Sequence, residues 1–158
     1  MKLCKPYYEI WEQESGLEGV YKMIEKVGRV CYKSEDKIAE GTAKPFVNRL
    51  MKSGHGAMLE HGTVYLMIPS NKAYDAFGDN WVIDSYGGSP YSIVRYSKED
   101  YCVTTNLRVL VENDWLDDLK YLCEPTEYHV KRVTVHFVCD RGVSHEFVRH
   151  RTINKLVA

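Results

Sequence analysis

The last part of the chain carries an unusual density of groups that can bind anions or transfer protons. Three arginines, two histidines and a glutamate stand within residues 141–151, namely Arg141, His145, Glu146, Arg149, His150 and Arg151. On a helix, Arg149 and Arg151 project about 200° apart, so they cannot bind the same atom. A helix end with cations on two faces can instead contact two anionic groups, or one ligand and a neighbouring subunit. Guanidinium groups suit phosphate, because they donate paired hydrogen bonds in one plane.

The same basic segment also has a purely structural explanation, and the residues alone leave both interpretations open. Cations are favoured near the C-terminal end of a helix and are often simply solvated there. A zinc protease site, in contrast, is excluded. The H-E-x-x-H pattern requires its second histidine where this chain has Arg149, and the histidine stands one position later, at His150.

A second cluster, GHGAMLEH at residues 54–61, lies just before a predicted strand. Three of its side chains suit a metal site, a cofactor site or a purely structural role: His55, Glu60 and His61. Gly54 and Gly56 allow the backbone to approach a ligand closely or to take a positive φ. A third segment, RVCY at 29–32, is on its own consistent with a routine helix terminus.

Composition narrows the class of protein. The chain has 158 residues, of which 44% are hydrophobic and 27% charged, as in one globular domain. With a net charge of −1, the chain lacks the excess of basic residues that a general nucleic-acid binder carries. The five cysteines are scattered without a C-x-x-C motif, which indicates a reducing compartment rather than a disulfide framework or a zinc ribbon.

Neither a secretory signal nor a membrane span is predicted. The first residues, MKLCKPYYEI, lack the apolar stretch of a signal peptide. The longest run of aliphatic and aromatic residues covers only positions 64–68, which is too short to cross a bilayer. We therefore expect a soluble cytoplasmic protein that binds neither membrane nor nucleic acid.

Hydrophobic periodicity predicts a mixed fold of the α+β or α/β class in a single domain, residues 1–158. Strands are predicted at 7–12, 63–68, 101–106 and 131–139, and helices at about 18–31, 43–53, 107–122 (broken near Asn113) and 141–151. Residues 70–128 form an insertion-like excursion, mostly loop up to residue 100 with a helical turn near 71–77.

Several residues are expected to set the ends and faces of these elements. Thr42 and Asp140 are candidate N-caps, and Gly54 is a candidate helix stop. Alternation in the last strand puts one apolar set on a common face: Val133, Val135, Phe137 and Cys139.

Taken together, the three motifs resemble the flavin-dependent thymidylate synthases. R-H-R at 149–151 resembles the start of that family's signature, in which a serine follows seven residues later. The segment at 54–61 resembles its flavin-side histidine loop, and RVCY at 29–32 resembles its R-V-S-[YF] segment. The three matches occur in the family's order and span most of the chain, which makes them more specific together than any one alone.

The resemblance implies an activity and an assembly. Family members methylate dUMP reductively to dTMP, taking the methylene from methylenetetrahydrofolate and the reducing equivalents from NADPH through FAD. A homotetramer whose sites are built from several subunits is implied, as is the fold of the thymidylate synthase-complementing proteins, with a largely antiparallel central sheet and helices. No metal is implied.

The resemblance also implies roles for particular residues. His55 and Arg149 correspond to catalytic positions, with His55 beside the flavin ring. Glu146, together with Arg149, corresponds to the nucleotide-binding positions. The remaining cofactor contacts implied by the motifs fall on His150, Arg151 and Cys31, the last near the flavin phosphates.

The chain departs from the family pattern after the R-H-R motif. The expected serine would fall one position beyond Ala158, and TINKLVA at 152–158 lacks the Asn-Glu pair usual there. This predicts, as an alternative, a truncated relative that folds and self-associates, binds FAD weakly and turns over little. A nucleic-acid-binding module using the basic helix is a further alternative, which the charge balance disfavours.

Overall fold

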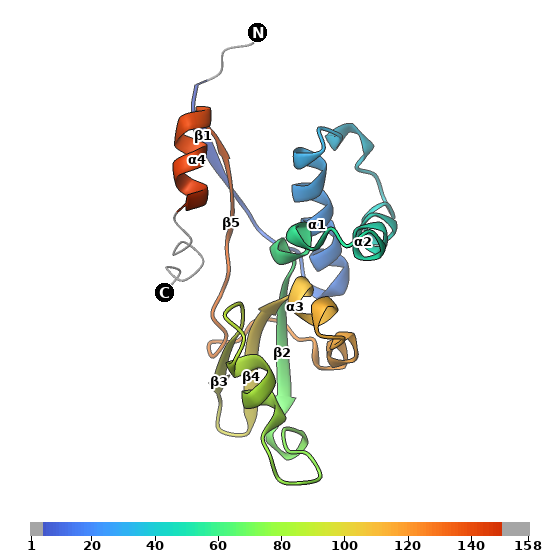
Figure 1. Cartoon of the computed structure of the whole chain (residues 1–158), viewed down its shortest axis with the longest axis vertical. Coiled ribbons are helices and arrows are strands. Elements are labelled where there is room, and N and C mark those ends of the chain that lie inside the picture. The colour runs from blue at the N-terminus through green and yellow to red at the C-terminus, as the bar shows by residue number, and fades with distance from the viewer. Residues whose placement is uncertain (1–4, 150–158) are drawn as a thin grey trace. The chain divides into compact units, whose positions relative to one another are not determined.

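The structure is a computed structural model that describes residues 5–149, with side chains through Glu146. It confirms the α+β class, with helices and two antiparallel sheets in this part of the chain. The helices and strands are β1 (Tyr7–Trp11), α1 (Gly16–Cys31), α2 (Ala43–Lys52), β2 (Thr63–Pro69), β3 (Ile93–Tyr96), β4 (Asp100–Asn106), α3 (Leu107–Glu112), β5 (Thr134–Val138) and α4 (Arg141–Arg149). Short 3₁₀ or π turns connect several of them (Figure 1).

The chain divides into two compact units. The larger unit covers residues 13–130 and contains α1, α2, α3 and the strands β2, β3 and β4. The smaller unit combines residues 1–12 with residues 131–158, and its described part contains β1, β5 and α4.

The sheet of the larger unit has the order β2-β4-β3, and both pairings are antiparallel. β4 is therefore the central strand, and all of its residues except Asp100 are buried. In the register, Thr63 lies opposite Asn106 and Ile93 lies opposite Thr104. The N-terminal end of β2 is consequently held beside the end of β4, where α3 begins.

The helices α1 and α2 lie side by side at one end of this sheet, with α3 next to them (Figure 1). The apolar residues of α1 recur at helical spacing, and Val20, Met23 and Ile24 are buried. The two helices approach closely at Gly28. A Cβ added there would lie 2.7 Å from the ring of Phe46 on α2, so only glycine fits without displacing the ring.

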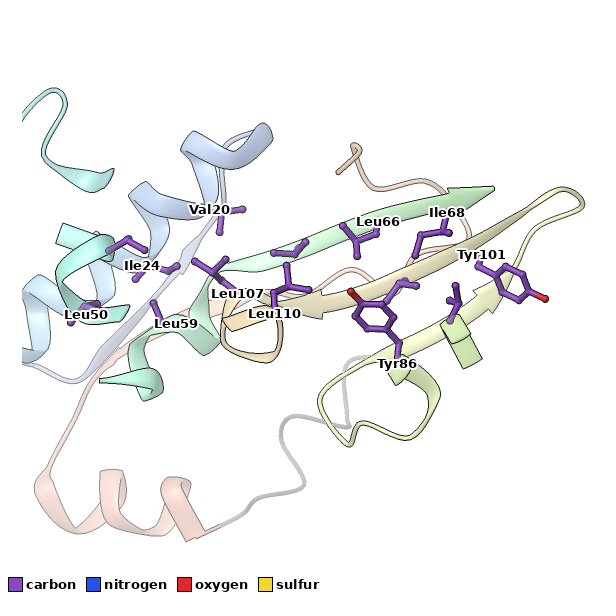
Figure 2. Close-up of a cluster of buried hydrophobic side chains, with 14 of the residues drawn as sticks. Val20, Ile24, Leu50, Leu59, Leu66, Ile68, Tyr86, Tyr101, Leu107 and Leu110 are labelled. Atoms are coloured by element: carbon purple, nitrogen blue, oxygen red, sulfur yellow. The ribbon is translucent and has the colours of Figure 1, made fainter. Parts of the chain in front are cut away.

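One continuous apolar cluster joins the helices to the sheet (Figure 2). It extends from Ile24 and Leu50 on the helical side to Leu66 and Tyr101 on the sheet. Such contiguous burial is the main favourable term in folding, because it removes apolar surface from water.

The segment after α3 is fastened to β2 by a buried histidine, His129, which is 4% exposed. Its Nδ1 accepts the backbone N–H of Thr126 (3.1 Å), so the ring hydrogen is on Nε2 and is donated to the carbonyl oxygen of Leu66 (3.1 Å). Burial lowers the pKa of His129, and the bond to Leu66 opposes this only in part. The neutral ring is therefore part of the folded structure.

Two predictions within 70–122 need correction. Residues 70–100 contain β3 and a π-helical turn, Ile83–Gly87, besides a 3₁₀ turn at Ser70–Lys72, so the segment is less loop-like than its composition suggests. The helix predicted after Asn113 is a 3₁₀ helix, Leu116–Tyr121. The break itself is confirmed, since α3 ends at Glu112.

The cap predictions have mixed outcomes. Asp140 accepts the N–H of Gly142 (2.7 Å) through Oδ1, which confirms it as an N-cap. Gly54 has φ of +70° and follows the end of α2, as a helix stop should. Thr42 stands at the N-cap position of α2, but its side chain makes no cap bond to that helix and contacts Glu25 instead.

The sheet of the smaller unit consists of the antiparallel pair β1 and β5. Tyr8 lies opposite Phe137 and Ile10 opposite Val135, so these four side chains share the face predicted from the alternation. They remain between 38% and 67% exposed. A two-stranded sheet has little means of burying a face by itself.

Candidate functional site

The histidine segment, residues 54–61, connects α2 to β2. Its last six residues, Gly56–His61, form a 3₁₀ helix. Leu59 is the one fully buried side chain of the segment and fixes it to the core. The N–H of His55 donates to the carbonyl of Leu50 (3.1 Å), so the backbone of His55 is fixed while its side chain remains exposed.

The ring of His55 is held by the hydroxyl of Tyr32, with 3.2 Å between Tyr32 Oη and His55 Nδ1. Tyr32 is the C-cap residue of α1 and is 49% exposed. When the hydroxyl donates to Nδ1, the ring hydrogen lies on Nε2, which can then act as a hydrogen-bond donor. The contact joins two of the motifs, because Tyr32 follows directly on Cys31, which is also exposed.

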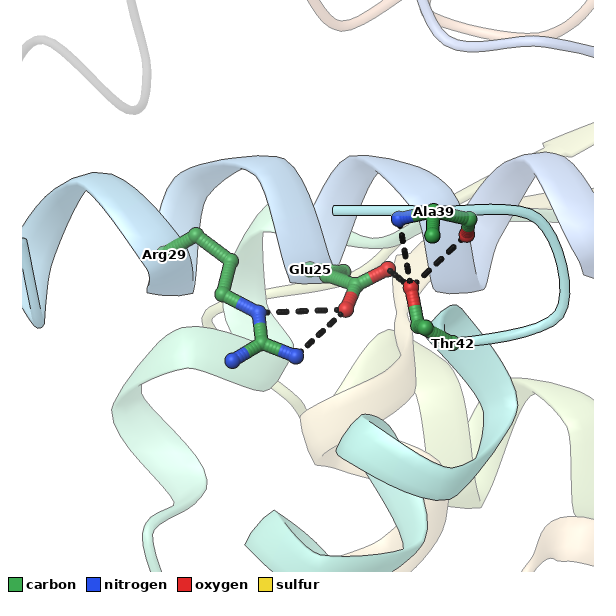
Figure 3. Close-up of polar contacts among 4 residues, drawn as sticks. All are labelled: Glu25, Arg29, Ala39 and Thr42. Atoms are coloured by element: carbon green, nitrogen blue, oxygen red, sulfur yellow. Dashed lines mark hydrogen bonds and ion pairs between the residues drawn. The ribbon is translucent and has the colours of Figure 1, made fainter. Parts of the chain in front are cut away.

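Arg29, the first residue of RVCY, points inward and is only 9% exposed. Its Nε and Nη2 donate to Oε1 of Glu25 at 3.1 and 2.9 Å, and its guanidinium lies 4.6 Å from the centre of the Phe46 ring. The other carboxylate oxygen of Glu25 is 2.9 Å from the hydroxyl of Thr42 (Figure 3). Arg29 therefore has a structural role in the helix pair.

Arg108, in the first turn of α3, reaches back to the histidine segment. Its Nη1 contacts Oε1 of Glu60, and its Nε donates to Oε1 of Glu112 at 2.6 Å. Both bonds raise the pKa of Arg108, the bond to Glu112 more than the bond to Glu60, so Arg108 remains a cation. Glu60 is consequently an anchor of the segment, and His61, the remaining candidate there, is exposed.

The candidates of the basic segment are only partly described. Glu146 lies on α4 and is exposed, and one turn earlier the Nε of Arg141 donates to Nε2 of His145 (3.3 Å). Arg149 is the last residue of α4, but its side chain lies outside the described part of the structure. His150 and Arg151 lie outside the described residues altogether.

The structure adds three residues that the motifs alone did not single out: Tyr32, Arg108 and Glu112. The sequence could have indicated Tyr32, since it belongs to the RVCY motif. Arg108 carries no such signal, because it lies 48 residues from Glu60, and only the pairing of β2 with β4 brings the two together.

Among the described residues, there is no cluster of three or more histidine, cysteine or acidic side chains arranged to hold a metal ion. In the same part of the chain, no helix combines the length and the apolar character needed to cross a membrane.

Comparison with known proteins gives one partial match. A flavin-dependent thymidylate synthase from Corynebacterium aurimucosum is 37% identical over 60 residues, which make up 37% of this chain and 24% of that enzyme. The matched segment is thus about a quarter of that relative's length. Neither a protein-family model nor a solved structure matches the chain significantly.

Proposed function

We propose that this chain is a flavin-binding protein of the flavin-dependent thymidylate synthase type, with His55 on the flavin side of its site. The observation that carries the proposal is the hydrogen bond between Tyr32 and His55. It joins two motifs that the resemblance associates with the flavin, although they lie 23 residues apart. The partial match to a named flavin-dependent enzyme supports the same conclusion.

The groups around His55 are of the kind that can form hydrogen bonds to a polar edge of FAD. The exposed imidazole and the Tyr32 hydroxyl lie together, and the exposed Cys31 directly precedes Tyr32 in the sequence. Cys31 is the weakest of the three, because a thiol is a poorer hydrogen-bond partner than the serine usual at this position in the family. We therefore expect Cys31 to contribute less to flavin affinity than His55.

In this proposal, the protein groups bind and orient the reactants. His55 would hold the flavin ring through a hydrogen bond from Nε2, while Tyr32 contacts the other ring nitrogen and so fixes the orientation of the imidazole. When bound and reduced by NADPH, the flavin supplies the hydride for methylation of dUMP to dTMP with methylenetetrahydrofolate.

The nucleotide-binding residues are proposed on the motif alone. We assign Glu146 and Arg149 to dUMP binding, and we assign Arg149, His150 and Arg151 to anionic groups of flavin or nucleotide. The assembly is likewise proposed on the resemblance: a homotetramer in which more than one subunit contributes to each site.

The experiment is a titration of the purified chain with FAD, followed by flavin fluorescence, together with an assay for dTMP formation from dUMP, methylenetetrahydrofolate and NADPH. We expect saturable binding that His55→Ala weakens about tenfold, the value of one good hydrogen bond. Tyr32→Phe should weaken it less. Tyr91→Phe is the control, because Tyr91 is 52% exposed and lies in a different loop.

Absence of saturable FAD binding would refute the proposal. So would an affinity that His55→Ala leaves unchanged. FAD binding without dTMP formation would instead favour the alternative of a catalytically inactive relative.

A further inference from the structure

The start of α3 is a firmly positioned base for Arg108. The N-cap Asn106, 1% exposed, accepts the N–H of Val109 (3.1 Å) through Oδ1. The adjacent Leu107 is fully buried, and its N–H donates to the carbonyl of Gly62 (2.9 Å). Arg108 therefore projects from backbone that is already tied both to the core and to the end of the histidine segment.

The guanidinium of Arg108 lies between two carboxylates from different elements. Glu60 belongs to the histidine segment, whereas Glu112 lies one turn further along α3. The side chains of Glu60, Arg108 and Glu112 are 29%, 32% and 51% exposed, respectively. Such partial exposure makes each contact a weak contributor to global stability but an adequate one for setting local geometry.

The same group also lies against the backbone next to His55. A Cβ added at Gly56 would be 3.3 Å from Nε of Arg108 and 3.2 Å from Oε1 of Glu112. The residue directly after His55 is thus packed against the charged group, and its lack of a side chain permits that approach. The 3₁₀ helix that begins there has poorer hydrogen-bond geometry than an α-helix, so it gains from an external support.

We propose that Arg108 is a positioning residue: by bridging Glu60 and Glu112 against Gly56, it holds the histidine segment so that His55 faces its ligand. This inference rests on the proposed flavin-binding function. Without the cation, two carboxylates repel each other beside Gly56, and the segment shifts to separate them. His55 then loses the backbone position from which its ring, already held by Tyr32, reaches the flavin.

The test is a double-mutant cycle on FAD affinity. The wild-type chain, Arg108→Gln, His55→Ala and the double variant are titrated with FAD, and circular dichroism verifies folding. Because a residue that acts through His55 must couple to it, Arg108→Gln should weaken binding about fivefold in the wild type and less than about twofold in the His55→Ala background. Arg108→Lys should restore part of the affinity. Arg95→Gln is the matched control, since Arg95 is exposed on β3.

Two results would overturn the inference. One is an equal loss of affinity in both backgrounds, which would mean that Arg108 acts independently of His55. The other is an effect of Arg108→Gln no larger than that of Arg95→Gln.

A second measurement separates this inference from the proposed function. Hydrogen exchange is followed at the amides of His55 and Gly62, which donate to the carbonyls of Leu50 and Leu59. We expect Arg108→Gln to speed exchange at both amides relative to Arg95→Gln. If the wild type binds no FAD, the proposed function fails, but hydrogen exchange still shows whether Arg108 holds the histidine segment. Exchange rates that Arg108→Gln leaves unchanged would overturn the role of Arg108.

Discussion

Two arginine–glutamate pairs with the same helical spacing differ in how deeply they are buried in this molecule. The side chains of Glu25 and Arg29 on α1 are 3% and 11% exposed, whereas the side chains of Arg108 and Glu112 on α3 are 32% and 51% exposed. The inner pair faces Phe46 and Thr42 between two helices. The outer pair faces the histidine segment. Sequence spacing alone therefore does not indicate the role of such a pair, whereas the burial of its two side chains does.

The difference has a physical origin in the cost of desolvation. A buried pair is stabilising only while both charges and their hydrogen bonds are present, because removing one partner leaves an uncompensated charge. A pair at the surface exchanges contacts with water at little net gain. We therefore assign the inner pair to stability and the outer pair to local geometry.

The largest effect is expected from Arg29→Met, which leaves the buried carboxylate of Glu25 with the Thr42 hydroxyl but without its cation. It should lower the free energy of unfolding by about 3–5 kcal/mol in urea denaturation. The double variant Glu25→Leu/Arg29→Met is the control, and it should recover much of the loss because no charge stays buried. A loss below about 1 kcal/mol in the single variant would contradict the comparison.

The next effect concerns two glycines, one beside each pair. Gly28→Ala puts a Cβ 2.7 Å from the Phe46 ring and should cost about 1–3 kcal/mol through overpacking. Gly56→Ala meets only Glu112 and Arg108 side chains at 3.2 and 3.3 Å, which can move, and should cost less than about 1 kcal/mol. Thermal or urea unfolding of both variants measures the contrast; equal costs would contradict it.

A buried group without a charge extends the comparison to pH. Burial holds the pKa of His129 below its ordinary value, so the unfolded chain takes up a proton first as pH falls. Stability from this group is fully present well above the ordinary histidine pKa of about 6.5, and it is lost as pH falls through the lower pKa of the folded state. Urea unfolding at pH values from about one unit above to about one unit below the ordinary histidine pKa of about 6.5 should show a flatter pH dependence in His129→Gln than in the wild type. An identical pH dependence of stability in the two proteins would contradict this role of His129.

The smallest effect is expected at the outer pair. Glu112→Gln removes one exposed ion pair and should cost only about 0.3–0.5 kcal/mol at low salt. Salt screens exposed charges, so the difference from wild type should vanish at about 1 M NaCl, whereas the cost of Arg29→Met should persist. A Glu112→Gln cost that is unaffected by salt would mean that this pair is desolvated after all.

The elements that could be predicted are those whose burial follows a simple period. α1, α2 and the strands β2 and β4 match the predicted ranges closely, because each presents one apolar face or lies in the middle of a sheet. β3 was not foreseen, since its four residues follow a stretch rich in glycine, serine and tyrosine, and pairing with β4 rather than local pattern makes it a strand.

The motifs singled out candidate residues, but the sequence did not indicate which of these residues lie together. The motif at 29–32 and the histidine segment come together through Tyr32 and His55, which no spacing rule would have indicated. Arg108 depends on the sheet register, which brings α3 to the histidine segment. The assignments of Glu146 and of residues 149–151 stay predictions from the motif.

The most direct test of the central claim is to locate the flavin by NMR of the histidine rings. The Cε1–H signals are recorded while FAD is added, with His55 identified through His55→Ala. We predict a saturable shift of the His55 signal, whereas His129, buried at 4% exposure, should not move. A His55 signal that stays unchanged at FAD concentrations that saturate the chain would contradict the assignment of this segment to the flavin.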